Sequence, residues 1–480
     1  MQERKTNMKT KLERMEQFFA DFFPSLLKIH PFLLGALITI TFLSQNTERY
    51  SSWAKSGVPF SSDIDQYYSY LPQIIIHKDP AFRNADRYWT TTLPNGNKIQ
   101  RFTIGVALME FPFFLVGHQL AKWYDYPEDG YSPPYGWALY YGAVMYVLLG
   151  LFFSYLLLRH FFSQWYSASM VFLLFFATNL FYYSVAEALM SHSFLFFLQS
   201  GFLYFLYRWL KGDGRKFLLS VAFFGAMAVL IRPTEILIFI FPLLLGVFDK
   251  ASFRNRFIFF RTHIKDIIFA SLILVLVLIP QVGYWKYVTG NWVYYSYGDE
   301  GFFFFDPKWV SFLFGYRKGL IPYSPILIFS LLGFIVLWFK KRDLFWSIFI
   351  FFLLNTYLLS CWWDYGFGGG LGNRALVQSY SSLILPQAFF FHWLVHLFRS
   401  TNLQRLCYGL FVLLASGFIH LNLMMVKQYK ETIIHWVGMN KETYWFVFGK
   451  EKFTSEDFII REKLITIPDF EKMKNGQRNQ

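Results

Sequence analysis

Long apolar stretches, separated by short polar loops, run along almost the whole chain. A helix needs about 20 mostly apolar residues to cross the hydrocarbon core of a bilayer. On this criterion the sequence predicts an all-α polytopic membrane protein with about eleven spans. The predicted spans cover residues 26–45, 135–158, 165–183, 192–209, 216–232, 234–248, 266–288, 322–340, 343–360, 376–398 and 404–426.

One further apolar segment, 105–121, is short and contains Glu110, Pro112 and His118. It fits a span, a re-entrant segment or a helix in the interface. Loops rich in Lys and Arg stay in the cytoplasm. The cationic loops agree with a cytoplasmic N-terminus only if 105–121 does not cross, so we expect eleven spans, with twelve or thirteen as the alternative. These loops are 4–14, 208–216, 250–265, 340–342 and 399–405.

This topology divides the chain into three parts. Residues 1–25 form a cytoplasmic N-terminal segment, 26–426 the transmembrane domain, and 427–480 a small, folded extracytoplasmic tail. All the loops rich in acids, glycine and aromatics fall on the extracytoplasmic face. They are 45–103, 123–134, the turns around Glu187 and Arg232, 286–319 and 361–374.

The composition supports the membrane assignment. Only 16% of residues are charged and 22% are aromatic, whereas soluble domains average about 25% charged residues. The net charge of +14 is explained by cationic cytoplasmic loops, so no nucleic-acid partner is expected. Cys361 and Cys407 are too few for a disulfide framework. No cleavable signal peptide is visible, and the first span would serve as an uncleaved anchor.

The first outer loop, 45–103, contains two closely spaced acids, Asp63 and Asp65. Ser61 is a good helix N-cap, and apolar residues follow at helical spacing, so we expect an amphipathic juxtamembrane helix, bent at Pro72. A carboxylate held near the water–lipid boundary is partly desolvated, which makes it a better general base. The alternative is that both acids only complement the helix dipole.

The position of this pair, directly after the first span of a protein with many spans, resembles the GT-C glycosyltransferases. These include protein O-mannosyltransferases and the lipid A aminoarabinose transferases. The segments 101–105, 177–180 and 232–235 also resemble stretches of bacterial members, although Thr103 and Ile104 replace two prolines. The resemblance implies a GT-C-like helix bundle in a bacterial inner membrane, and inverting transfer of a sugar from a polyprenyl phosphate carrier at the extracytoplasmic face.

Such a transfer needs one carboxylate as base, because phosphate is a good leaving group and requires no general acid. It also needs cations where negative charge develops. Arg317 and Lys318 lie at an outer helix end, where a lipid phosphate would lie, and Asp299 and Glu300 are candidates to bind sugar hydroxyls. The alternative is that the two cations are interfacial anchors that snorkel.

A glycine-rich loop, 361–374, ends in Arg374, whose guanidinium is suited to grip a phosphate. The alternative is a generic flexible loop. Lys98 and Arg101 are candidates to meet the phosphate from the other side. Glu187 and His192 flank a turn at the outer ends of two spans. Together with Asp63 or Asp65 these two residues could bind a divalent cation. No metal-ligand spacing supports such a site, and a hydrogen-bonded pair between packed helices is favoured. Glu110, His118 and Arg232 are weaker candidates at the membrane edge.

The sequence therefore predicts an integral membrane glycosyltransferase, with Asp63 or Asp65 as base. Its partners would be a polyprenyl-phosphate-linked hexose or pentose and a glycan, lipid or protein acceptor of the cell envelope. The first alternative is a transporter or flippase for a lipid-linked saccharide, in which the same aromatics and cations line a path. A polysaccharide polymerase or ligase is the second, although such enzymes normally use a large loop late in the chain.

Overall fold

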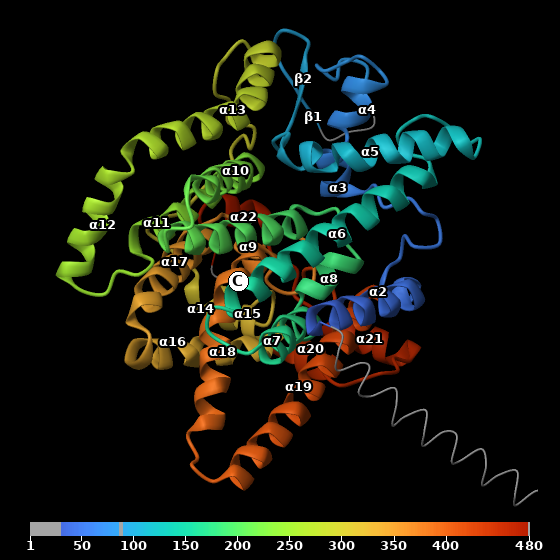
Figure 1. The fold of residues 1–480 in the computed structure, drawn as a ribbon. Coiled ribbons are helices and arrows are strands. Elements are labelled where there is room, and N and C mark those ends of the chain that lie inside the picture. Colours follow the sequence, from blue (N-terminus) through green and yellow to red (C-terminus); the bar gives the residue numbers. More distant parts are fainter. Residues whose placement is uncertain (1–29, 86–89, 479–480) are drawn as a thin grey trace, which may run out of the picture.

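The structure, a computed structural model, describes residues 30–85 and 90–478. The predicted cytoplasmic segment 1–25 lies outside these residues. Helices dominate the described chain (Figure 1), which confirms the all-α prediction. Within the described ranges the strands are β1 (Thr90–Thr92) and β2 (Lys98–Gln100), an antiparallel pair that aligns Thr91 with Ile99.

Each predicted span corresponds to a helix or to two helical pieces in sequence. Breaks occur where the backbone cannot continue, as at Pro233 and Pro325, which lack the amide hydrogen that a helix interior requires. The corresponding elements are α2 (Pro31–Tyr50), α6 (Pro133–Leu158), α7 (Gln164–Ala177) with α8 (Leu180–Val185), α9 (Ser191–Leu210), α10 (Arg215–Ile231), η1 (Pro233–Phe239) with α11 (Ile240–Leu244), α13 (Ile264–Thr289), η2 (Pro325–Leu327) with α16 (Ile328–Lys340), α17 (Arg342–Ser360), η3 (Arg374–Ser379) with α18 (Tyr380–His396), and α19 (Thr401–Lys430).

By length and hydropathy, four described helices meet the criterion for a single-helix span: α6, α13, α17 and α19. Three shorter apolar segments, 164–177, 233–244 and 325–340, join them. The ambiguous stretch 105–121 is one continuous helix, α5 (Gly105–Trp123), with Pro112 inside it.

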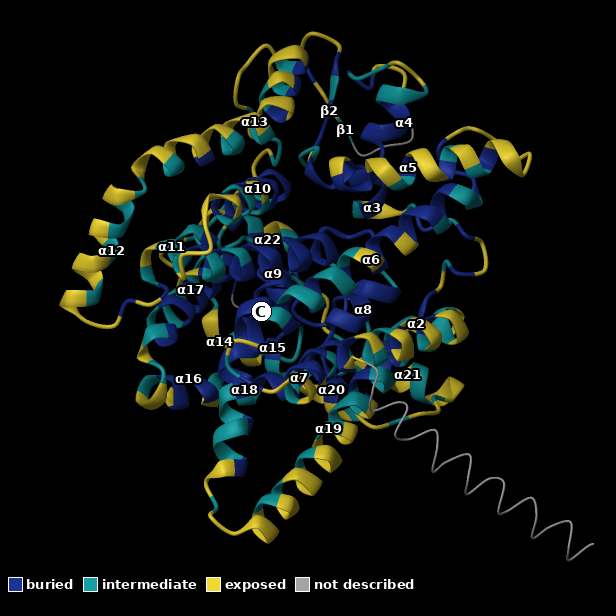
Figure 2. Ribbon diagram, viewed as in Figure 1, coloured by how far each residue is buried: buried dark blue, intermediate teal, exposed yellow. Residues whose placement is uncertain are grey.

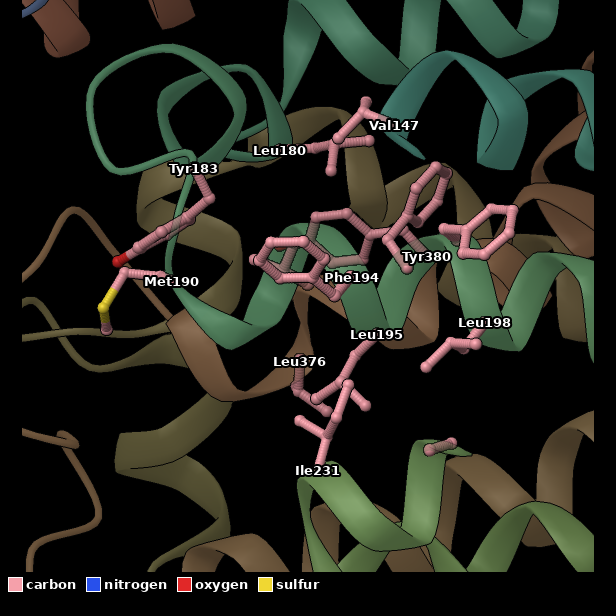
Figure 3. Packing of buried hydrophobic residues seen from close by; sticks show 14 of the residues in the cluster. Val147, Leu180, Tyr183, Met190, Phe194, Leu195, Leu198, Ile231, Leu376 and Tyr380 are labelled. Atoms are coloured by element: carbon pink, nitrogen blue, oxygen red, sulfur yellow. The ribbon is translucent and has the colours of Figure 1, made fainter. Parts of the chain in front are cut away.

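The buried centre of the bundle lies around α9, which packs against α6, α10 and η3. Figure 3 shows Leu195 of α9 beside Ile231 of α10 and Leu376 of η3, all fully or almost fully buried. Close packing of this kind holds membrane helices together, because lipid tails are as apolar as the side chains and provide no hydrophobic driving force.

Two helical arms project from this bundle (Figure 1). One is an arc in which α12 (Lys250–Thr262) leads into α13, and the other is a hairpin of α18 and α19. The apolar side chains of α13 and α19 are largely exposed (Figure 2), for example Leu276 and Leu413. An exposed apolar surface of this size indicates contact with lipid.

The first outer loop contains the predicted helical segment, but this segment bends at a different residue. Two short helices, α3 (Ser62–Tyr68) and α4 (Tyr70–Ile75), meet at Ser69 rather than at Pro72. Pro72 lies in the first turn of α4, where its missing amide hydrogen would have no helical partner in any case. Tyr67 and Tyr68 are buried, so this helix pair is anchored to the bundle.

The residues after α19 form a compact segment with α20 (Lys441–Val447), α21 (Ser455–Leu464) and α22 (Phe470–Lys474). The Tyr444 hydroxyl donates to the Pro322 carbonyl at 2.7 Å, beside α15 (Leu320–Tyr323). Arg478, 1% exposed, donates to the carbonyl oxygens of Asp306, Ser360 and Trp362 at 2.6 to 2.8 Å. The segment therefore packs on the loops around α14 (Trp309–Phe314) and the end of α17.

Candidate active site

A large cavity, about 980 Å³ in volume, opens among the loops that the sequence assigned to one face. Segments far apart in the chain meet there: the first outer loop with α3, the turn after α8, the turn before η1, the loop 293–302, the glycine-rich loop 361–374 and the C-terminal segment. Many of the lining side chains are aromatic, and acids and arginines lie among them.

Asp63 lines this cavity and forms an ion pair with Arg374. The distance from Arg374 Nη2 to Asp63 Oδ2 is 3.1 Å, although 311 positions separate the two residues. Asp63 lies in the first turn of α3, and Arg374 begins η3. The meeting of an early carboxylate with a late arginine is the arrangement that the sequence predicted.

Asp65 is placed differently. Residues two positions apart on a helix point in roughly opposite directions, because each residue advances the helix by about 100°. Asp65 is buried, 9% exposed, and does not line the cavity. Of the predicted pair, only Asp63 is thus in a position to contact a ligand there.

The glycine-rich loop holds Arg374 at the cavity. Gly368, Gly370 and Gly372 have backbone φ angles of +68°, +140° and +65°, which L side chains rarely adopt. A Cβ atom at Gly370 would lie 2.5 Å from the Tyr183 hydroxyl, and one at Gly372 would lie 2.5 Å from the Tyr323 Cβ. The loop is therefore a closely packed structure, not the flexible connection that was the alternative.

Arg317 and Lys318 support this loop from behind and do not line the cavity. Arg317 Nη2 lies 2.9 Å from Asp364 Oδ1, and the same carboxylate accepts the backbone amide of Gly368 at 2.6 Å. The Lys318 ammonium group donates to the Gly370 carbonyl. Both side chains point inward, unlike snorkelling anchors. Their hydrogen bonds are with the loop, apart from a contact of 3.9 Å from Arg317 Nη1 to Met473 Sδ in the C-terminal segment.

Burial is the main influence on the Lys318 amine. It lowers the pKa of Lys318 to about 7, and the nearby charges of Arg317 and Arg374 act in the same direction. Arg374 behaves differently: burial acts to lower its pKa, but Asp63, Glu187 and neighbouring tyrosines together outweigh burial and raise the pKa.

Glu187 lines the cavity and is held by the Tyr182 hydroxyl, which donates to Oε1 at 2.8 Å. Burial raises the pKa of Glu187, and the charge of Arg374 opposes that rise. His192 lies behind the cavity wall, fully buried, with its ring edge-on to Tyr183 at a centroid distance of 5.0 Å. In the described part of the chain no three His, Cys, Asp or Glu side chains are grouped to hold a metal ion.

The remaining candidates divide between cavity and surface. Arg101 and Glu300 both line the cavity and pair at 3.1 Å, with the Arg101 guanidinium 5.8 Å from the Tyr297 ring centroid. Asp299 is exposed and lies 3.8 Å from Lys474, outside the cavity lining. Lys98 also lies outside it, and its amine donates to the Ala85 carbonyl at 3.1 Å.

Arg232 and the C-terminal segment are more prominent at the cavity than the sequence indicated. Arg232, a weaker candidate from the sequence, lines the cavity and forms no salt bridge with any residue that the structure describes. The C-terminal segment supplies Trp436 and Phe470 to the cavity. The sequence signal for the role of the C-terminal segment was the number of aromatic residues in a polar tail.

Fold and site together define an all-helical membrane protein with a loop-built cavity at one face. No known family model matches this chain, and no curated protein matches its sequence. The chain is similar in fold to ArnT from Cupriavidus metallidurans in the apo state, with 13% identity over 82% of this chain and 70% of that chain and a TM-score of 0.47.

Two more solved structures are similar. ArnT from Cupriavidus metallidurans bound to undecaprenyl phosphate has 13% identity over 83% of this chain and 71% of that one, with a TM-score of 0.44. The Archaeoglobus fulgidus oligosaccharyltransferase in the apo form has 13% identity over 92% of this chain and 60% of that one, with a TM-score of 0.49. These similarities concern the fold alone, and they assign no role to any residue.

Proposed function

We propose that this protein is an integral membrane glycosyltransferase that takes a sugar from a polyprenyl phosphate carrier, with Asp63 as its general base. The observation that carries the proposal is the Asp63–Arg374 pair inside a large cavity. A carboxylate and cations that converge at one cavity are what transfer from a lipid phosphate sugar requires.

The reaction follows from this placement. The acceptor hydroxyl gives its proton to Asp63, and the electron pair of its oxygen forms the new bond to the anomeric carbon. The bond from that carbon to the phosphate oxygen breaks, and its electron pair leaves with the polyprenyl phosphate. Attack from the face opposite the leaving group inverts the anomeric centre.

The cations act on the leaving group. Arg232 lines the cavity without a carboxylate partner in the described chain, so its charge is available to an anion. The donor phosphate competes with Asp63 for the Arg374 guanidinium. Binding of the donor therefore releases Asp63 from its ion pair and leaves its carboxylate open to the acceptor hydroxyl.

The rest of the cavity suits a sugar and the first part of a lipid. Its volume, about 980 Å³, is at the upper end of ordinary small-molecule sites. Trp53, Trp285, Trp362 and Trp436 offer flat apolar faces to a sugar ring. Glu187 and Glu300 offer acceptors for hexose or pentose hydroxyls. We place the reaction at the extracytoplasmic face of a bacterial inner membrane, with a glycan, lipid or protein of the envelope as acceptor.

The test is transfer from a radiolabelled lipid-linked sugar in membranes that contain the Asp63→Asn variant. Loss of a general base reduces the rate by about 100- to 10,000-fold, so we expect transfer to fall by that factor. Asp299→Asn is the matched control, because the Asp299 side chain is exposed and does not line the cavity. It should transfer at the wild-type rate.

Two outcomes oppose the proposal. Wild-type transfer by Asp63→Asn would show that Asp63 is not the base. Movement of the intact lipid-linked saccharide across the membrane by wild-type protein, with no transfer product, would favour a flippase.

A further inference from the structure

A buried polar network lies beneath the two cavity arginines. Glu235, Gln199 and Gln378 are 4%, 2% and 1% exposed. The Gln378 amide donates to Glu235 Oε1 at 2.8 Å, and the Gln199 amide donates to Glu235 Oε2. The Ser381 hydroxyl completes the network by donating to Gln199 Oε1 at 3.3 Å. Both carboxylate oxygens of Glu235 are therefore bound by side-chain amides.

The network joins two short 3-10 helices that carry the cavity cations. Arg232 directly precedes η1, which contains Glu235, and Arg374 begins η3, which contains Gln378. The backbone amide of Glu235 donates to the Arg232 carbonyl at 2.9 Å. The hydrogen bond between Glu235 and Gln378 consequently links the segments from which the two arginines extend.

Such a network is costly in the interior of a membrane protein. Ionisable side chains are rare there, and each polar group must find a partner to offset its desolvation. Apolar side chains in place of both Glu235 and Gln378 would pack without that cost. The desolvation cost of the network is explained if the two arginines must keep a set separation. Two cations recognise an anion best when their geometry is fixed before binding.

We propose that Glu235 and Gln378 are positioning residues that set the separation of Arg232 and Arg374 and thereby the affinity of the cavity for a phosphate. This inference rests on the proposed function, because it takes the anion to be a polyprenyl phosphate. Neither residue touches the ligand. Each acts through the arginine at the start of its own 3-10 helix.

The first experiment measures binding of undecaprenyl phosphate to the purified full-length protein, from the change in tryptophan fluorescence. Gln378→Leu removes the link between the 3-10 helices, and we expect affinity to fall about tenfold, as is typical when a residue that orients a binding group is lost. In the transfer assay KM for the donor should rise, and kcat should fall as well, because the same two arginines stabilise the leaving phosphate.

The matched control is Ser200→Ala. It breaks a buried hydrogen bond of 3.1 Å between Ser200 and Ser154, on the same helix as Gln199 but without a link to either arginine. We expect wild-type affinity. Glu235→Gln is a second test variant of nearly unchanged volume, for use if Gln378→Leu does not fold. Its neutral amide loses one acceptor of the network, and affinity should fall in the same direction.

A double-mutant cycle separates positioning from a general structural role. In an Arg232→Ala background, Gln378→Leu should cost much less affinity than it does in wild type, because one of the groups it positions is gone. Additive losses, or wild-type affinity in Gln378→Leu and Glu235→Gln, would overturn the inference. If Arg232→Ala and Arg374→Ala both bind undecaprenyl phosphate like wild type, the proposed function itself fails, and this result is distinct from the preceding one.

Discussion

At the scale of single residues, burial and partners give different tasks to side chains of the same charge. Arg374 pairs with Asp63 at the cavity, whereas Arg317 pairs with Asp364 behind the glycine-rich loop. Lys318 is buried with only a backbone carbonyl as its described hydrogen-bond partner. A cation so placed is sensitive to pH.

Lys318 should make stability depend on pH. Its folded pKa is lowered to about 7, from about 10.5 in the unfolded chain. Above pH 7 the folded protein has released a proton that the unfolded chain still holds. The free energy of unfolding therefore rises with pH from about 7 to 10, by up to about 1.4 kcal/mol per pH unit from this group. Below pH 7 this dependence disappears.

The measurement is the apparent unfolding temperature in detergent between pH 6 and pH 9, for wild type and Lys318→Met. We expect the variant to show a weaker rise with pH, because it lacks the titrating amine. Identical slopes in the two proteins would show that Lys318 keeps an ordinary pKa when folded.

At the scale of elements, close helix contacts depend on glycine. Helices α16 and α18 pack along each other, and a Cβ atom at Gly333 of α16 would collide with the Pro386 carbonyl of α18. Backbone cannot move aside as a flexible side chain can. We expect Gly333→Ala to destabilise the fold by about 1–3 kcal/mol, measured as a lower apparent unfolding temperature.

Gly417 provides the control for this substitution. It lies in α19, and a Cβ atom there would meet nothing within 4 Å. Gly417→Ala should leave stability unchanged or raise it by about 1 kcal/mol through helix propensity. Equal losses in the two variants would mean that the contact of α16 with α18 is not the cause.

The C-terminal segment should act as part of the cavity wall. Arg478 fastens this segment to three backbone carbonyls, and Phe470 of α22 lines the cavity. With Arg478→Ala we expect faster proteolysis of the segment and a several-fold rise in KM for the donor. Lys472 is an exposed residue of α22. Lys472→Ala should change neither the rate of proteolysis nor the KM for the donor. Unchanged KM despite faster proteolysis would remove the segment from the site.

At the scale of the whole molecule, we expect the loops around the cavity to lie on one side of the membrane. The loop 124–132 follows α5, and its Gly130 carbonyl accepts a hydrogen bond from the Tyr68 hydroxyl of α3. Because Asp63 of the same short helix lines the cavity, this contact brings the loop that follows α5 to the cavity side. We therefore expect that α5 does not cross, as the positive-inside rule predicts.

Single cysteines in a Cys407→Ser background test this topology. Asn291→Cys and Tyr126→Cys should react with a membrane-impermeant maleimide from outside intact cells, and Lys211→Cys only after permeabilisation. Native Cys361 is buried and should stay silent. Labelling of Tyr126→Cys only after permeabilisation would show that α5 spans the membrane.

The sequence by itself determined the helical class, the approximate positions of the long apolar helices and the candidate status of Asp63, Arg101, Glu187 and Arg374. The physical reason is that apolar length and loop charge act locally, so a linear pattern records them. The position of the bend in the first outer loop was predicted less well. The bend after α3 occurs at Ser69, because Pro72 lies in the first turn of α4, where a helix tolerates proline.

Only the tertiary structure decided which of these candidates share a cavity. It separated Asp63 from Asp65 through the direction each side chain takes on α3, and it turned Arg317 and Lys318 towards the glycine-rich loop. It also brought the C-terminal segment to the site and joined Glu235 to Gln378 across 143 positions. Contacts between residues so distant depend on how all the helices pack at once, which no local pattern of the chain records.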